Sequence, residues 1–386
     1  MPTGEPRGFD RFEFATASRI IFGVGTSEQL PGLIAALGQR PMLVTGANAE
    51  RYNRLVPAMA TIRIPGEPTV AVVEQGAQLA RDHRCDIVIA IGGGSAIDAG
   101  KAIAALVTNP GDAFDYLEVV GHGKPLAHPS LPFIAMPTTS GTGAEVTRNA
   151  VLTVPDAKLK VSLRSAHLLP RIALVDPALT VDLPPRQTAA SGLDALTQLI
   201  EPFLSTRANP LTDALCRDGI TLAARALPVA FREPDTMSAR SDMALAALYS
   251  GIALANAGLG AVHGFAAPIG GLFAAPHGAV CAALLPHVLR ANLAAMRARA
   301  PQHPSIARCT EVACLLTARA DATAEDGIDW CVRAAGEFAI PRLSQWGVTA
   351  AHAPDLATKA AAASSMKANP IALTMAELVA IAEAAL

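Results

Sequence analysis

Short runs of apolar and β-branched residues alternate with helical segments through the first half of the chain. The runs within 40–48, 84–95 and 131–143 each lead into glycine or a small polar loop, which is typical of a buried parallel strand followed by a turn. Residues 71–83 have the apolar periodicity of a helix, and 160–180 predicts one or two further short strands. Strands that alternate with helices predict a doubly wound α/β layer.

The pattern changes at residues 183–191 (LPPRQTAAS), and from there to Leu386 it is helical nearly throughout. The Pro-Pro pair ends the α/β part, and Ser191 has the residue type of a helix N-cap. We therefore predict two domains, an α/β domain over 1–184 and an all-α domain over 185–386.

Composition narrows the classes of function. The chain has 386 residues, of which 51% are hydrophobic and 17% are charged, and its formal net charge is −2. Nucleic-acid binding needs a clustered excess of Lys and Arg, so we expect no nucleic-acid partner. No apolar run approaches the roughly 18–20 residues that span a bilayer, and the opening MPTGEPRGFD lacks the apolar core of a secretory signal. The six cysteines form no CxxC pair, which favours reduced thiols in a cytoplasmic protein.

Residues 90–106 (AIGGGSAIDAGKAIAAL) predict a strand, a glycine turn and a helix. The glycines at 92–94 let the backbone approach a ligand, because no Cβ intervenes. Ser95 can cap the helix or bond a phosphate oxygen, and the helix N-terminus attracts a pyrophosphate. Asp98 and Lys101 fit either a salt-bridged helix face or a site wall. The spacing is neither GxGxxG nor a Walker loop, so it indicates only a phosphorylated ligand, and an ordinary βα turn is the alternative.

A second loop rich in small polar residues lies at 137–147 (PTTSGTGAEVT), with hydroxyls at Thr138, Thr139 and Thr142. Open α/β sheets bind ligands at the carboxyl ends of their strands. Two such loops after two strands therefore favour a binding site over a pair of capped turns.

Together these stretches resemble the iron-containing (group III) alcohol dehydrogenases. The resemblance runs in family order over nearly the whole chain, through FGVGT (22–26), GGGSAIDAGK (92–101), PTTSGTGAEVT (137–147), LLPRIALVDPALT (168–180), GLDALTQLIEP (192–202) and VHGFAAPIGGLFAAPHG (262–278). It implies a dehydroquinate synthase-like architecture, with a nucleotide-binding α/β domain followed by an all-α domain. It also implies hydride exchange between NAD or NADP and a small alcohol or aldehyde.

By position, the resemblance implies that Gly93, Gly94 and Ser95 contact the pyrophosphate of the cofactor. We also count Asp98, on the same helix, among the cofactor-binding residues. The resemblance assigns Thr138, Thr139 and Thr142 to the adenine and ribose side, and Lys160 to the nicotinamide ribose.

Gly46 stands where the family often has an acidic residue that bonds the adenosine ribose and repels a 2′-phosphate. NADP is therefore permitted, with Arg51 or Arg54 able to supply charge nearby. A turn glycine beside two solvated arginines is the alternative.

The resembling family holds a divalent ion with an aspartate, a histidine four residues later and two further histidines. Asp194, His263 and His277 match three of these positions, and Gln198 occupies that of the second ligand. Side chains four apart on a helix point the same way, so we expect Gln198 to ligate as well. Its amide oxygen is a weaker donor than imidazole, so the Fe²⁺ or Zn²⁺ would be held more loosely. We expect Asp194, His263 and His277 to be the catalytic residues, around an ion that polarises the substrate oxygen.

Several alternatives stay open. A hydroxyacid–oxoacid dehydrogenase or transhydrogenase of the same family would need a cation for the substrate carboxylate. A phosphate-substrate relative would need more basic residues than Arg207. A metal-independent reductase and a nucleotide-binding protein without catalysis are also consistent with Gln198, and with Ala267 where many members have a second histidine. By family analogy we expect a homo-oligomer, a dimer or larger.

Overall fold

A six-stranded parallel sheet forms the centre of the first half of the chain in this computed structural model, which describes residues 11–47, 49–52 and 54–386. The strand order is β1-β8-β5-β4-β2-β3, and every neighbouring pair is parallel. The strands are β1 (Ile20–Phe22), β2 (Pro41–Thr45), β3 (Ala60–Arg63), β4 (Ile87–Gly92), β5 (Phe133–Pro137) and β8 (Ile172–Val175). The predicted α/β layer is confirmed.

Successive residues of the central strand β4 enter different cores, because neighbouring side chains of a strand point to opposite faces. Ile89 packs on the face covered by α1 (Leu30–Leu37). Val88 packs on the other face, which α2 (Val70–Asp82) and α3 (Gly94–Thr108) cover. With helices on both faces, β4 is apolar throughout, which is why it reads in the sequence as a continuous apolar run.

The helix predicted over 71–83 is α2. The strands predicted within 160–180 belong to two different sheets. β7 (Leu159–Arg164) pairs in antiparallel fashion with β6 (Asn149–Val154) in a separate hairpin, whereas β8 joins the main sheet. A short helix, α4 (Ala113–Tyr116), precedes β5.

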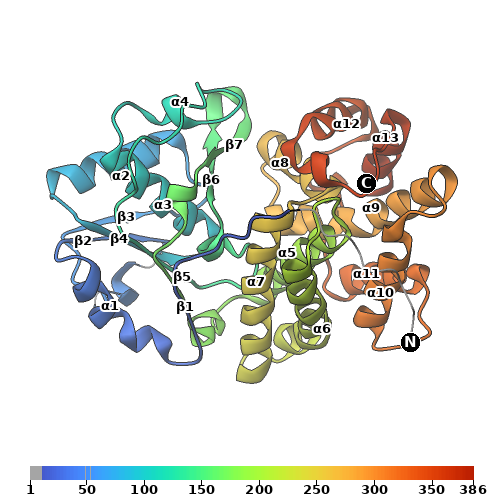
Figure 1. Cartoon of the computed structure of the whole chain (residues 1–386), viewed down its shortest axis with the longest axis horizontal. Coiled ribbons are helices and arrows are strands. Elements are labelled where there is room, and N and C mark those ends of the chain that lie inside the picture. Colours follow the sequence, from blue (N-terminus) through green and yellow to red (C-terminus); the bar gives the residue numbers. More distant parts are fainter. Residues whose placement is uncertain (1–10, 48, 53) are drawn as a thin grey trace.

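The second half is helical, as predicted. Its helices are α5 (Pro185–Leu204), α6 (Pro210–Arg232), α7 (Met237–Ala257), α8 (Ala261–Phe273), α9 (His277–Arg299), α10 (Pro304–Thr317), α11 (Ala324–Glu337), α12 (Ala353–Ala362) and α13 (Met375–Ala384). In Figure 1 they lie on the right, beside the α/β part on the left.

The expectation that Ser191 caps the first of these helices is wrong. Helix α5 begins at Pro185, whose fixed φ suits the first helical position. Ser191 lies within the helix, where its Oγ donates a hydrogen bond to the Gln187 carbonyl oxygen over 2.7 Å.

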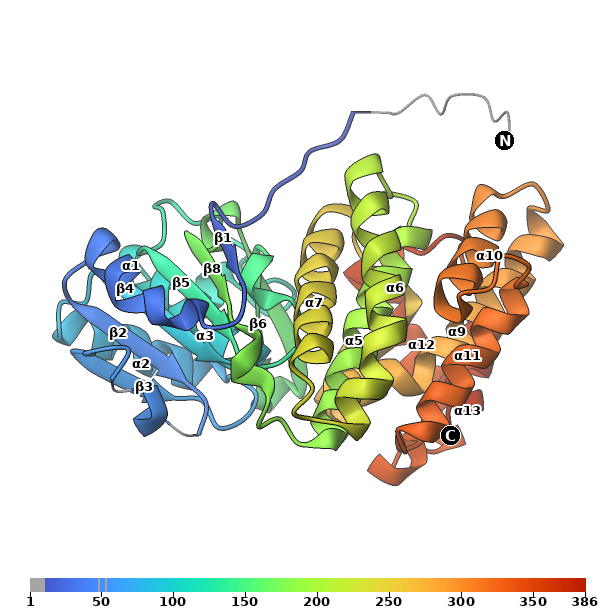
Figure 2. The same cartoon turned by 90° about the horizontal axis from the view of Figure 1, so that it is seen from below.

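Two glycines allow the α/β part to meet the helical part closely. Gly143 has φ +58°, and a Cβ on it would lie 2.4 Å from Gly251 Cα in α7. Only glycine tolerates both this conformation and this approach. The loop at 137–147 is thereby held against α7, the helix that lies next to the sheet in both views (Figure 2).

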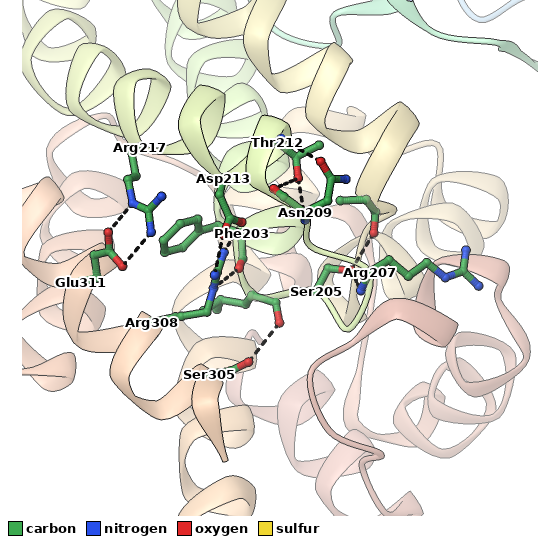
Figure 3. Close-up of polar contacts among 12 residues, drawn as sticks. Phe203, Ser205, Arg207, Asn209, Thr212, Asp213, Arg217, Ser305, Arg308 and Glu311 are labelled. Atoms are coloured by element: carbon green, nitrogen blue, oxygen red, sulfur yellow. Dashed lines mark hydrogen bonds and ion pairs between the residues drawn. The ribbon is translucent and has the colours of Figure 1, made fainter. Parts of the chain in front are cut away.

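A buried ion pair fixes the far end of α5 (Figure 3). Arg308 Nη1 of α10 donates to Asp213 Oδ2 of α6 over 2.8 Å. Its Nε donates to the Phe203 carbonyl oxygen over 2.5 Å, and its guanidinium stacks 3.8 Å from the Phe203 ring centre. The helix that carries Asp194 is therefore anchored by α6 and α10 at its C-terminal end.

By length and mean composition alone, α9 is apolar enough to cross a membrane, although Pro286, His287 and Arg290 interrupt its apolar residues. However, 72% of its most apolar window is buried inside the protein, as in a core helix. Helices α7 and α8 pass the same test only when read together across a 101° bend.

Candidate metal and nucleotide site

Four potential ligand atoms from three helices meet in the helical part. They belong to Asp194 of α5, His263 of α8, and His277 and Cys281 of α9, and all lie within 4.8 Å of one another. Asp194 Oδ1 is 3.6 Å from His263 Nε2 and 3.7 Å from His277 Nε2. Cys281 Sγ is 3.8 Å and 3.7 Å from the same two nitrogens. The structure therefore brings together three predicted residues and one cysteine that the sequence analysis missed.

The glycine after His277 lets α9 approach α5. A Cβ on Gly278 would lie 2.4 Å from the Ala190 carbonyl oxygen and 3.3 Å from Asp194 Cβ. The N-terminus of α9 is therefore in contact with the turn of α5 that precedes and includes Asp194. This contact places His277, the first residue of α9, next to the carboxylate.

The Asp194 carboxylate has the environment of a metal ligand. The residue is 2% exposed, and its Oδ1 has no hydrogen-bond partner among the described residues. A buried polar atom left unpaired costs about 1–3 kcal/mol, and a charged one costs more. The two imidazole nitrogens near Oδ1 are beyond hydrogen-bond distance but suitably placed to share a cation with it. The residues present therefore fit a divalent ion.

His263 is oriented by a buried glutamate. Its Nδ1 lies 2.6 Å from Glu201 Oε2, and Glu201 Oε1 accepts a hydrogen bond from the Val262 N–H over 2.7 Å. A carboxylate at Nδ1 holds the proton there and leaves Nε2 free to ligate. Glu201 was not among the residues predicted from the sequence. The available signal was its place seven residues after Asp194, two turns along the same face of α5.

Negative neighbours raise the pKa of both histidines. Burial opposes the charged form of His277, but Cys281 and Asp194 outweigh it and raise its pKa to about 9. Burial likewise opposes charge on His263, yet Cys281 and Glu201 raise its pKa well above the ordinary value. Burial would raise the pKa of Asp194, but His277 and His263 hold it below the ordinary value. The cluster therefore favours positive charge, supplied by protons or by a metal ion.

Gln198 lies next to the cluster. It is 3% exposed, and together with the two histidines it lowers the pKa of Asp194. Its Oε1 accepts a hydrogen bond from Ser250 Oγ over 3.3 Å. Its assignment as a ligand stays a prediction.

The two polar loops meet at the carboxyl ends of β4 and β5. A Cβ on Gly94 would lie 2.8 Å from Thr142 Oγ1, and one on Gly93 would lie 3.3 Å from Thr139 Cγ2. Gly93 is the N-cap of α3 and no side chain caps this helix. Its first N–H groups and the positive end of its dipole are thus available to an anion.

Three other predicted cofactor residues are placed around this edge. Thr138 N donates to the Gly92 carbonyl oxygen over 2.9 Å, and Ser95 lies in the first turn of α3. Gly46 follows β2, and a Cβ on it would meet nothing within 4 Å. The carboxyl ends of β2, β4 and β5 thus carry Gly46, the glycine turn and the threonine loop side by side.

Asp98 lies on a salt-bridged face of α3, which is one of the two alternatives that the sequence allowed. Its Oδ2 accepts a hydrogen bond from the Val151 N–H over 3.0 Å, and its Oδ1 lies 3.4 Å from the fully buried Lys101 Nζ. These contacts tie α3 to β6. Whether Asp98 also contacts the cofactor stays a prediction.

Lys160 lies where the two parts of the molecule meet. Its Nζ forms an ion pair with Glu67 Oε1 at 3.0 Å. A Cβ on Gly270 of α8 would lie 3.1 Å from the same Nζ. The predicted nicotinamide-ribose residue is therefore in contact with the helix that carries His263.

Comparison with known proteins assigns both halves of the chain to one family. The family model for iron-containing alcohol dehydrogenase matches residues 17–177, and the model for the C-terminal part of the Fe-containing alcohol dehydrogenase family matches residues 188–386. Alcohol dehydrogenase 4 of Saccharomyces cerevisiae (strain YJM789) is 39% identical over 274 residues, which cover 70% of this chain and 68% of the yeast chain.

Solved structures agree with this assignment. A crystal structure of 1,3-propanediol oxidoreductase has a TM-score of 0.89 and 32% identity, and the match covers 98% of this chain and all of that one. Sulfoacetaldehyde reductase from Bifidobacterium kashiwanohense, in complex with NAD⁺, has a TM-score of 0.85 and 27% identity over 97% of this chain and 98% of that one.

Proposed function

Because the chain belongs to the iron-containing alcohol dehydrogenase family, an NAD(P)-linked group of alcohol and aldehyde oxidoreductases, we propose that Asp194, His263 and His277 hold the divalent ion of its active site. The observation that carries this proposal is the buried, unpaired Oδ1 of Asp194, with both Nε2 atoms within 3.7 Å of it. These are the three residues that the sequence assigned to the reaction.

When bound, the divalent ion acts as a Lewis acid on the alcohol or carbonyl oxygen, while the nicotinamide accepts or returns the hydride. The residues of this chain bind and orient. Glu201 keeps the proton of His263 on Nδ1, so that Nε2 faces Asp194. The side chain of His277 is 34% exposed, whereas those of Asp194 and His263 are buried. A substrate therefore reaches the cluster from the His277 side, while the other side excludes water.

The cofactor extends from the N-terminus of α3 toward α8 in this proposal. Gly93, Gly94 and Ser95 approach the pyrophosphate, the threonine loop lies along the adenine and ribose side, and Lys160 reaches the nicotinamide ribose. The open space at Gly46 accommodates a 2′-phosphate, which supports NADP alongside NAD. Arg51 is an exposed cation nearby, although it forms an ion pair with Asp182 at 2.8 Å.

We favour an uncharged alcohol or aldehyde over a hydroxyacid as substrate. A carboxylate would need a cation close to the metal cluster. Lys160 lies against α8, but its charge is already balanced by Glu67. This pairing supports the uncharged substrate.

The ion is iron or zinc in this proposal. The six free cysteines of the described chain support a reducing compartment, which agrees with the expected cytoplasmic location. The homo-oligomeric state stays a prediction by family analogy.

Elemental analysis of the purified protein, together with NADH and NADPH oxidation on short aldehydes and oxoacids, tests the proposal. We expect about one equivalent of a divalent transition metal, and turnover of aldehydes that a chelator abolishes. Full turnover by protein that contains no metal would contradict the metal assignment. Tight NADPH binding with no turnover on any compound would support the non-catalytic alternative.

A further inference from the structure

We propose that Cys281 is a ligand of the divalent ion and replaces the histidine that is missing at position 198. The ion is then held by Asp194, His263, His277 and Cys281. This inference rests on the proposed function, because it requires that an ion binds beside Asp194.

The spacing of the four donor atoms is close to what a single ion imposes. Bonds of about 2.0 Å to oxygen and nitrogen and about 2.3 Å to sulfur, in a tetrahedron, place oxygen and nitrogen about 3.3 Å apart and nitrogen and sulfur about 3.5 Å apart. The structure has 3.6 and 3.7 Å for the oxygen–nitrogen pairs. It has 3.8 and 3.7 Å for the sulfur–nitrogen pairs. These four pairs need to close by only a few tenths of an ångström, and the nitrogen–nitrogen and oxygen–sulfur pairs lie within 4.8 Å.

Helix α9 presents both of its donors at once. His277 and Cys281 are four residues apart, so their side chains lie on the same face, one above the other. Cys281 is fully buried, and the polar contacts of its Sγ are to the two ring nitrogens. A thiol has a single proton and can donate it to only one nitrogen at a time, whereas a shared ion satisfies the sulfur and both nitrogens.

On helix α5, Gln198 lies four residues after Asp194 but does not direct its ligating atom at the cluster. The amide oxygen of Gln198, the only atom of its side chain that ligates, accepts a hydrogen bond from Ser250 Oγ over 3.3 Å. Coordination by Gln198 would require this oxygen to give up that hydrogen bond. The ligand that the sequence lacks on α5 is therefore supplied from α9.

A thiolate changes the charge and the metal preference of the site. Two anionic ligands, Asp194 and Cys281, make the occupied site neutral, whereas one aspartate with neutral ligands leaves it at +1. Sulfur ligands favour Zn²⁺ over harder ions such as Mn²⁺ or Mg²⁺. Zinc can take a fifth ligand, so four protein donors still leave room for a substrate oxygen. We therefore expect a zinc-preferring site.

Co²⁺ substitution tests this inference without reference to activity. Metal-free protein is titrated with Co²⁺ and its absorption spectrum is recorded. We expect the visible d–d bands of a bound ion together with a near-ultraviolet thiolate-to-cobalt charge-transfer band. Cys281→Ser should abolish the charge-transfer band and weaken Zn²⁺ binding, measured by chelator competition, at least about tenfold. Cys309→Ser removes another buried helical thiol, outside the cluster, and should leave the band unchanged.

The outcomes separate the inference from the proposed function. Visible bands without a charge-transfer band in the unaltered protein, with Zn²⁺ affinity unchanged in Cys281→Ser, would overturn the cysteine ligand and leave the metal site standing. No binding of Co²⁺ or Zn²⁺ to the unaltered protein would overturn both. Adding Gln198→His to Cys281→Ser should restore Zn²⁺ affinity and give visible bands without the charge-transfer band, which also shows that the variant is folded.

Discussion

Helices α5 and α9 each carry two polar side chains four residues apart near one point, and the two pairs behave differently. On α9, His277 and Cys281 both aim at the centre of the cluster. On α5, Asp194 aims at it, but the amide oxygen of Gln198 is bonded by Ser250. The spacing of residues along a helix determines the direction of a side chain, whereas the neighbouring helices determine which groups that side chain contacts.

The comparison also shows how α5 contributes without a second ligand. Glu201 lies two turns after Asp194 and bonds the Nδ1 of His263. In our proposal α5 thus supplies one ligand and the group that orients another, while α9 presents two donors directly. The variants below test this division of roles, from the largest expected effect to the smallest.

Removing the first donor of either helix should have the largest effect. We expect Asp194→Ala, and separately His277→Ala, to lower kcat/KM for aldehyde reduction at least about a hundredfold, because loss of an outer-shell partner alone costs about 10–100-fold. NADPH binding, followed by its fluorescence, should persist because these residues lie outside the glycine turn. Unchanged turnover in either variant would show that its helix supplies no ligand.

Weakening the orienting group should have the next largest effect. Glu201→Gln keeps the shape but removes the charge, and we expect metal affinity to fall about 10–100-fold. Glu74→Gln changes a half-buried carboxylate of α2 that accepts a hydrogen bond from the Ala113 N–H, away from the cluster, and serves as the control. Chelator competition measures both variants, and equal affinities would leave Glu201 without a positioning role.

Metal affinity should depend on pH through the histidines. Their raised pKa, about 9 for His277, means that below this value a proton must leave before the ion binds. Affinity should therefore rise with pH by about tenfold per unit for each displaced proton, and the part due to His277 should level off above about pH 9. In Cys281→Ser the levelling should begin at lower pH, since the thiol group raises the pKa of His277. A pH-independent affinity would contradict this competition.

Changing Gln198, the second polar residue of the pair on α5, should have the smallest effect. Gln198→Leu removes the hydrogen bond with Ser250 but, on our inference, no ligand, and we expect Zn²⁺ affinity to change by only a few-fold. Gln198→His should tighten binding, because imidazole is a better donor than an amide. A loss in Gln198→Leu as large as that in Asp194→Ala would assign the glutamine to the ion instead.

Much of the fold follows from local sequence pattern. The continuous apolar run of β4 predicts a strand covered on both faces, and the periodicity of 71–83 predicts α2. The start of α5 was misplaced because Ser191 has the residue type of an N-cap, whereas Pro185 already suits the first helical position. The edge strands β1 and β3 escaped prediction, since three or four residues carry too little pattern.

The sequence by itself predicted three of the four residues in the cluster, the glycine turn and the division into an α/β part and a helical part, because these depend on residue type and spacing along the chain. Only the tertiary structure decided that Cys281 joins the cluster, that Glu201 orients His263 and that Gln198 bonds Ser250. These contacts join residues 18, 62 and 52 positions apart. Their formation depends on how α5, α7, α8 and α9 pack, which no local pattern specifies.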